Sequence, residues 1–91
     1  MNIGSVVIAV VSAGWVFVGQ IDDSPDDRYL VLCRASAVRK WGTSRGLGEL
    51  AMRGPLKDTV LDPVGSVWLE TPTHVLFRIP CDAKSWKGKL S

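Results

Sequence analysis

The hydrophobic pattern of the chain predicts five β-strands joined by short turns. Residues 3–11 (IGSVVIAVV) are almost continuously apolar and β-branched, as in a strand that is buried on both of its faces. Ser12-Ala13-Gly14 then provides a hairpin turn. The other predicted strands place their apolar residues on two alternating faces and cover residues 15–21, 28–33, 64–70 and 74–79.

One segment has the spacing of a helix instead. Its apolar residues recur at helical intervals, a Gly/Ser/Thr-rich turn precedes it, and Gly54-Pro55 ends it. The helix is expected over residues 44–53, packed on the sheet through Leu47, Leu50 and Ala51. The predicted fold is therefore a single α+β domain, with a mostly antiparallel and strongly curved sheet or small β-barrel and one short helix.

The domain is expected to occupy residues 1–81, followed by a basic tail. Residues 82–91 carry Trp86 among three lysines and are predicted to be mobile, or ordered by a partner chain. Ninety-one residues suffice for one domain with a small core, which burial in a homo-oligomer would stabilise further.

Composition excludes several functional classes. The net charge of +2 is too small to indicate a nucleic-acid-binding protein by itself. Cys33 and Cys81 lack the spacing of a metal or redox site, and a single histidine cannot complete one, so we expect no metal, no cofactor and two reduced thiols in the cytoplasm. The apolar N-terminal run has no preceding Lys or Arg and is broken at residues 12–14, which favours strands over a signal peptide or membrane span.

No catalytic constellation emerges from the sequence. His74 begins a predicted strand without an evident acidic or nucleophilic partner, and Ser12 lacks a G-x-S-x-G context. The aspartate-rich loop at residues 22–27 lacks the spaced ligands of a calcium loop. We therefore expect a protein that is not an enzyme.

The segment from Arg34 to Pro55 carries the candidate binding chemistry. It contains the sharpest excess of positive charge in the chain, an aromatic residue and a glycine-rich turn that leads into the predicted helix. Arginine forks and hydroxyl groups suit phosphate, and a tryptophan face suits a base. The predicted ligand-binding residues are Arg34, Arg39, Lys40, Trp41, Thr43, Ser44, Arg45 and Gly46, with Trp15 as a second stacking residue.

The same segment also has a purely structural interpretation. Trp41 would then pack in the core or in an oligomer interface, the glycines would serve a tight turn, and the arginines would form a solvated face. Neither a Walker motif nor a G-x-G-x-x-G motif is present to decide between the two interpretations.

Three short motifs resemble a small family of bacteriophage and prophage proteins of unknown function. They are Ser12-Ala13-Gly14, then Trp41 with a Gly/Ser-rich turn and residues 47–54 (LGELAMRG), and the closing Ile79-Pro80-Cys81. The turn at residues 42–46 (GTSRG) is more basic than the resemblance would lead us to expect. The resemblance implies a phage origin. Small phage proteins of this size include anti-defence proteins that oligomerise and trap immune signals.

The leading functional prediction is a homo-oligomeric protein of the infected cell's cytoplasm that sequesters a phosphorylated nucleotide-type signal, such as a cyclic nucleotide or an ADP-ribose-type molecule. A small-barrel nucleic-acid-binding protein is one alternative. Another is a phage protein-interaction or virion component that uses its apolar N-terminal strand as a sheet edge and binds no small ligand.

Overall fold

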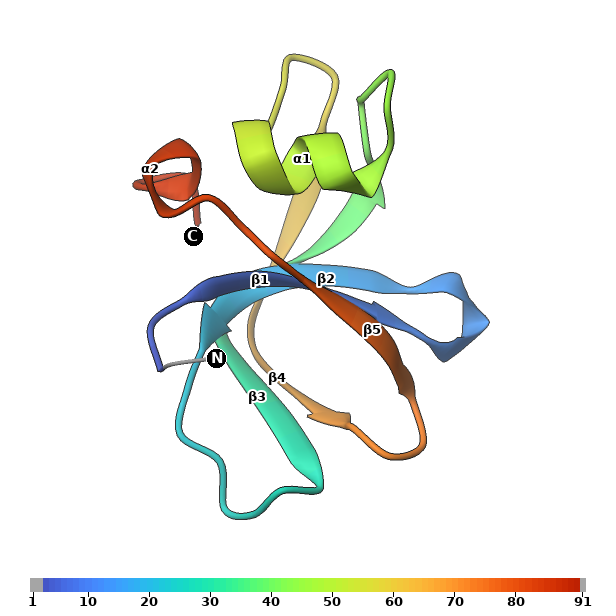
Figure 1. Ribbon diagram of the computed structural model, residues 1–91, viewed down its shortest axis with the longest axis vertical. Helices are drawn as coiled ribbons and strands as arrows, with labels where there is room; N and C mark the ends of the chain where they lie inside the picture. The colour runs from blue at the N-terminus through green and yellow to red at the C-terminus, as the bar shows by residue number, and fades with distance from the viewer. Residues whose placement is uncertain (1–2, 91) are drawn as a thin grey trace.

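The computed structural model describes residues 3–90 and contains one five-stranded antiparallel sheet with short helical segments (Figure 1). The strands are β1 (Val6–Val11), β2 (Val16–Ile21), β3 (Tyr29–Lys40), β4 (Val60–Glu70) and β5 (Val75–Pro80). The helical segments are the 3-10 turn η1 (Ser12–Gly14), α1 (Leu47–Arg53) and α2 (Ala83–Trp86). The predicted α+β class, with five mostly antiparallel strands and a short helix near residues 44–53, is confirmed.

The strand order is β4-β3-β2-β1-β5, so β4 and β5 form the two edges of the sheet. No ladder joins β4 to β5 within residues 3–90, and closure into a barrel stays a prediction. β1 lies between β2 and β5 and is hydrogen-bonded on both sides. The prediction that the N-terminal strand offers a free edge is therefore wrong, because both of its edges are already paired.

Strand β3 runs seven residues beyond its predicted end at Cys33, as far as Lys40. The sequence pattern concealed this continuation because the pairing with β2 and β4 shifts around Arg34, whose φ of 50° is left-handed. Such a bulge puts the residues before and after it out of phase, which breaks the two-residue alternation. Arg39 and Lys40 consequently lie in a strand rather than in a loop.

Strand β4 also begins earlier than predicted, at Val60 rather than Val64. Pro63 argued against a strand here, but it lies on an edge strand, where proline is tolerated. Helix α1 is shorter than predicted and begins at Leu47, because residues 43–46 form a turn in front of it.

Apolar side chains gather in one cluster on each face of the sheet. The first cluster packs beneath α1 and α2 and contains Ile8, Val16, Val18, Val38, Leu47, Leu50, Ala51, Trp86 and Leu90. The second contains Val7, Ala9, Val11, Ile21, Leu30, Leu32, Ala35 and Leu69. Figure 1 shows both helices on the same side of the sheet, and the α1 face with Leu47, Leu50 and Ala51 is buried as predicted.

The C-terminal segment folds back onto the domain. Trp86 is only 1% exposed, and its Nε1 donates to the backbone oxygens of Leu50 and Ala51, each at 3.2 Å. Leu90 is also buried in the same cluster. Trp86 and Leu90 therefore anchor residues 83–90 to the core, in contrast to the mobile tail that the interspersed lysines suggested.

Candidate functional site

The glycine-rich turn before α1 uses its own polar groups internally. The Thr43 hydroxyl accepts from the Gly46 N–H and donates to the Gly46 carbonyl, both at 3.0 Å. The Ser44 N–H donates to Glu49 Oε1 at 3.1 Å. The Gly46 N–H, predicted to contact phosphate, is thus already bonded within the turn, and the Ser44 N–H is bonded to a carboxylate of the helix that follows.

Gly42 has a structural role in this turn. Its φ is 67°, and a Cβ atom at this position would lie 2.3 Å from the backbone of Asp58 and Thr59. Only glycine combines the left-handed conformation with so close an approach. The glycine at this position is therefore explained by the packing of the turn against the segment that leads into β4.

The predicted binding residues divide among separate hollows instead of converging on one. Lys40, Thr43 and Ser44 line a hollow of about 440 Å³, here called the Lys40 hollow. Trp15 and Arg39 line another of about 340 Å³, here called the Trp15 hollow. Arg34, in the middle of β3, lines a third hollow of about 330 Å³.

Trp41, Arg45 and Gly46 line none of these hollows. Trp41 is 43% exposed, and its ring lies against Gly46, with 4.0 Å between the ring and an ideal Cβ on the glycine. Arg45 is exposed on the same turn.

Charges of both signs line the Lys40 hollow. Lys40 and Arg53 face Glu49 and Asp58 around it. Arg53 Nη1 lies 3.3 Å from Glu49 Oε2, which pairs one of these cations within the same helix. Arg53 is therefore neutralised by Glu49, whereas Lys40 forms no ion pair within residues 3–90.

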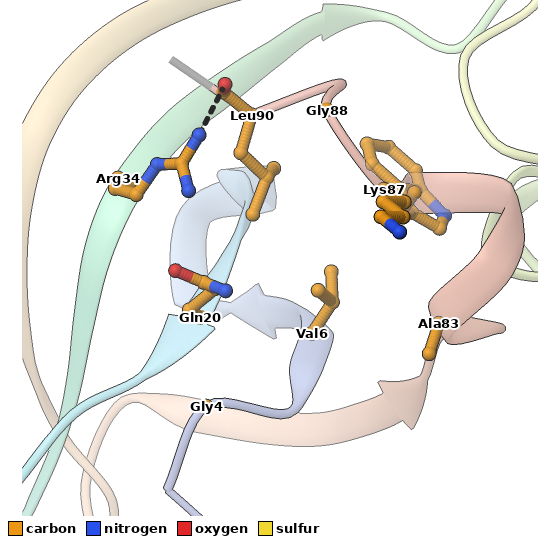
Figure 2. Close-up of a pocket in the computed structure, with 9 residues that line it drawn as sticks. Gly4, Val6, Gln20, Arg34, Ala83, Lys87, Gly88 and Leu90 are labelled. Carbon is orange, nitrogen blue, oxygen red and sulfur yellow. Dashed lines mark hydrogen bonds between the residues drawn. The ribbon is translucent and has the colours of Figure 1, made fainter.

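In the third hollow, Arg34 interacts with the C-terminal segment, as Figure 2 shows. Its Nη2 donates to the Leu90 carbonyl at 3.1 Å. The hollow is lined by Trp86 and Lys87 on the C-terminal side and by Val6 and Gln20 on the sheet side. Arg34 thus lies apart from the other predicted cations and contributes to the closure of the fold.

The Trp15 hollow combines an exposed aromatic ring with a two-bonded ion pair. Trp15 is 59% exposed and stacks on Phe17, with 6.2 Å between ring centroids and 13° between the planes. On the other side of the hollow, Arg39 forms a fork with Asp62: Nε lies 2.9 Å from Oδ2 and Nη2 lies 3.1 Å from Oδ1. The buried residues Val16, Ala37 and Val38 complete its mainly apolar lining.

Neighbouring strands place these groups together. Phe17 of β2 pairs with Ala37 of β3, which in turn pairs with Asp62 of β4. Arg39 lies two positions beyond Ala37, at a shift of register between Val38 and Lys40, and its side chain reaches Asp62 on β4. Asp62 was missed at the sequence level because it fell in a segment expected to be irregular, 23 positions from its arginine partner, and only the β3–β4 register reveals the pair.

A second contact that sequence reasoning missed joins Ser12 and His74. Ser12 Oγ lies 3.1 Å from His74 Nδ1, so His74 does have a hydroxyl partner, contrary to the expectation. The Ser12 N–H also donates to the His74 carbonyl, which ties the β1–β2 turn to the β4–β5 turn. No carboxylate within residues 3–90 bonds to the imidazole, so the third group of a catalytic triad is missing there.

Among residues 3–90, histidine, cysteine and carboxylate side chains do not gather in threes as a metal site requires. No helix in that part of the chain is long and apolar enough to cross a membrane.

Comparison of the sequence with protein-family models and with characterised proteins, and of the fold with solved structures, finds no match.

Proposed function

We propose that the protein binds a phosphorylated nucleotide-type ligand without transforming it, and that the base of this ligand lies in the Trp15 hollow. The observation that carries the proposal is the exposed Trp15 ring, which Phe17 holds in place within a mainly apolar lining and beside the Arg39–Asp62 fork. Stacking of a base on an aromatic side chain contributes roughly 1–3 kcal/mol. An aromatic ring already held by its neighbour binds at a smaller entropic cost.

The phosphate groups of the ligand would interact with exposed cations near the end of β3. Lys40 and Arg45 form no ion pair within residues 3–90, whereas Arg39 is paired with Asp62. Thr43 and Gly46 maintain the shape of the turn through their mutual hydrogen bonds. Phosphate is therefore attracted mainly by the charge of Lys40 and Arg45, and the base supplies most of the specificity.

In its biological setting, the protein would sequester a host immune signal in the cytoplasm of an infected cell. The resemblance to small phage proteins and the absence of a complete catalytic set among residues 3–90 support this role. A homo-oligomer would bring several copies of Lys40 and Arg45 around a polyanionic signal.

Replacement of Trp15 by leucine tests this assignment directly. Calorimetric titration with GMP, AMP, cyclic GMP, cyclic AMP and ADP-ribose should detect binding of at least one of them to the unaltered protein. Trp15→Leu should weaken that binding by roughly 5- to 150-fold, the equivalent of 1–3 kcal/mol of stacking. The nucleotide should be recovered chemically unchanged after prolonged incubation.

Trp68→Leu is the matched control. Trp68 is 58% exposed, close to the exposure of Trp15, but it packs against Tyr29 away from the hollow. Its replacement should leave the affinity unchanged. The proposal fails if none of the five nucleotides binds, or if both substitutions weaken binding equally.

A further inference from the structure

We propose that Arg39, oriented by Asp62, recognises the O6 and N7 atoms of a guanine base. The inference rests on the proposed nucleotide-binding function and assigns the base that the Trp15 hollow selects. The groups that carry it are the Arg39–Asp62 fork and the Trp15 ring, which line the same hollow.

The fork uses only one edge of the guanidinium group. Asp62 accepts from Nε and from Nη2, which are the two nitrogens along the side of the arginine. A guanidinium group has five N–H donors, so both hydrogens of Nη1 and one hydrogen of Nη2 remain for other partners. At the end of the group, Nη1 and Nη2 present two parallel donors in a fixed plane.

A pair of parallel donors matches guanine better than the other bases. Guanine carries two adjacent acceptors, O6 and N7, on one edge, and bidentate bonding of arginine to these atoms is the commonest specific contact with this base. Adenine presents N7 beside an amino group, so one arginine donor would face another donor. The pyrimidines have no N7 and offer no matching pair of acceptors.

Charge favours a base over a phosphate at this fork. The positive charge of Arg39 is matched by Asp62, whose carboxylate would repel an approaching phosphate. The edge of a guanine base is neutral, so it gains the hydrogen bonds without this repulsion. The mainly apolar lining and the exposed Trp15 ring suit a flat aromatic ligand in the same way.

Asp62 acts in this proposal as a positioning residue. Without its carboxylate, the Arg39 side chain, which is 68% exposed, would be free to adopt many rotamers. The two bonds to Asp62 hold the guanidinium plane at a defined angle to the hollow. Loss of Asp62 should therefore reduce the preference among bases more than it reduces overall nucleotide binding.

Four nucleoside monophosphates separate the contributions of individual base atoms. GMP and IMP both carry O6 and N7 and should bind equally well, because the proposed contact does not use the N2 amino group. 7-Deaza-GMP lacks N7, and AMP replaces O6 by an amino group. Both should bind roughly tenfold or more weakly than GMP, which is the discrimination expected of one bidentate contact.

Arg39→Lys preserves the charge but removes the fork, so the affinity ratio between GMP and AMP should fall close to one. Asp62→Asn should lower the same ratio while binding persists. The matched control is Arg28→Lys, since Arg28 forms a comparable fork with Asp26 in a loop outside the Trp15 hollow. This control should leave the ratio unchanged.

The outcomes distinguish the two proposals. Equal binding of GMP and AMP by the unaltered protein would overturn the guanine assignment and leave nucleotide binding standing. A preference for GMP that survives Arg39→Lys would also overturn it. The proposed function itself would be overturned if none of these four nucleotides binds and none of the five ligands of the calorimetric titration binds.

Discussion

Replacement of Trp86 by alanine should cost the domain a large part of its stability. Trp86 is 1% exposed and belongs to the cluster between the sheet and the two helices. Truncation of a buried tryptophan or phenylalanine to alanine costs roughly 3–5 kcal/mol through lost burial and the resulting cavity. A domain of this size has a free energy of unfolding of about 5–15 kcal/mol, so the loss is a fifth of the total or more.

Trp86→Phe separates the ring from its hydrogen bonds. Its Nε1 is shared between the carbonyls of Leu50 and Ala51, and each carbonyl has a second donor, Gly54 N at 3.0 Å and Asp82 N at 2.9 Å respectively. Neither oxygen would therefore be left without a partner. The phenylalanine variant should lose only about 1–2 kcal/mol, from the hydrogen bond and the smaller ring.

Urea denaturation followed by far-ultraviolet circular dichroism gives the free energies of unfolding of these variants. Lys87→Ala is the control, because Lys87 is an exposed neighbour and surface substitutions usually change stability by less than about 0.5 kcal/mol. If Trp86→Ala lowered the stability by no more than Lys87→Ala does, the packing of the C-terminal segment onto the sheet would be refuted.

Two further predictions concern single positions elsewhere in the domain. Gly42→Ala should lower the melting temperature severely, because the new Cβ would lie 2.3 Å from backbone atoms at a φ of 67°. Gly48 occupies an open helical position, so Gly48→Ala should raise the melting temperature slightly. Similar melting temperatures for the two variants would contradict this prediction. Burial raises the pKa of the Cys81 thiol from its ordinary value of 9.0 to about 12, so alkylation of Cys81 at pH 8 should be far slower in the native protein than in urea. Since the folded pKa lies above the unfolded one, the contribution of this thiol to stability is complete below pH 9 and is lost as the pH rises towards 12; equal alkylation rates in both states would disprove the burial effect.

The strands could be predicted from the sequence wherever their apolar residues follow one regular pattern from end to end. β2 and β5 were located within a few residues because their apolar and aromatic positions alternate from end to end, and β1 because its apolar run is continuous. β3 was truncated because the left-handed residue Arg34 shifts the phase at its centre. A bulge of this kind is invisible to periodicity, since its presence depends on the partner strand.

The candidate site was harder to predict because it depends on strand register. Local charge excess drew attention to Arg39, but the carboxylate that neutralises it lies on another strand, 23 residues away. Trp15 was identified as a stacking residue on its aromatic character, and its neighbourhood with Arg39 follows from the pairing of β2 with β3. The lysines around Trp86 suggested solvent exposure, whereas Trp86 and Leu90 are both buried in the cluster that also contains Leu50 and Ala51 of α1.

The position of β5 beside β1 has a consequence for the order of folding. Val7 pairs with Pro80, so the first strand to emerge during synthesis waits for the last one before its second edge is covered. Contacts this distant along the chain form slowly. Until they form, the sequence VVIAVV of β1 presents an uncharged and highly β-prone edge, the kind of segment that recruits other chains into aggregates. β5 therefore protects the nascent protein as well as completing its sheet, and shortening the chain before Val75 would leave its most aggregation-prone strand uncovered.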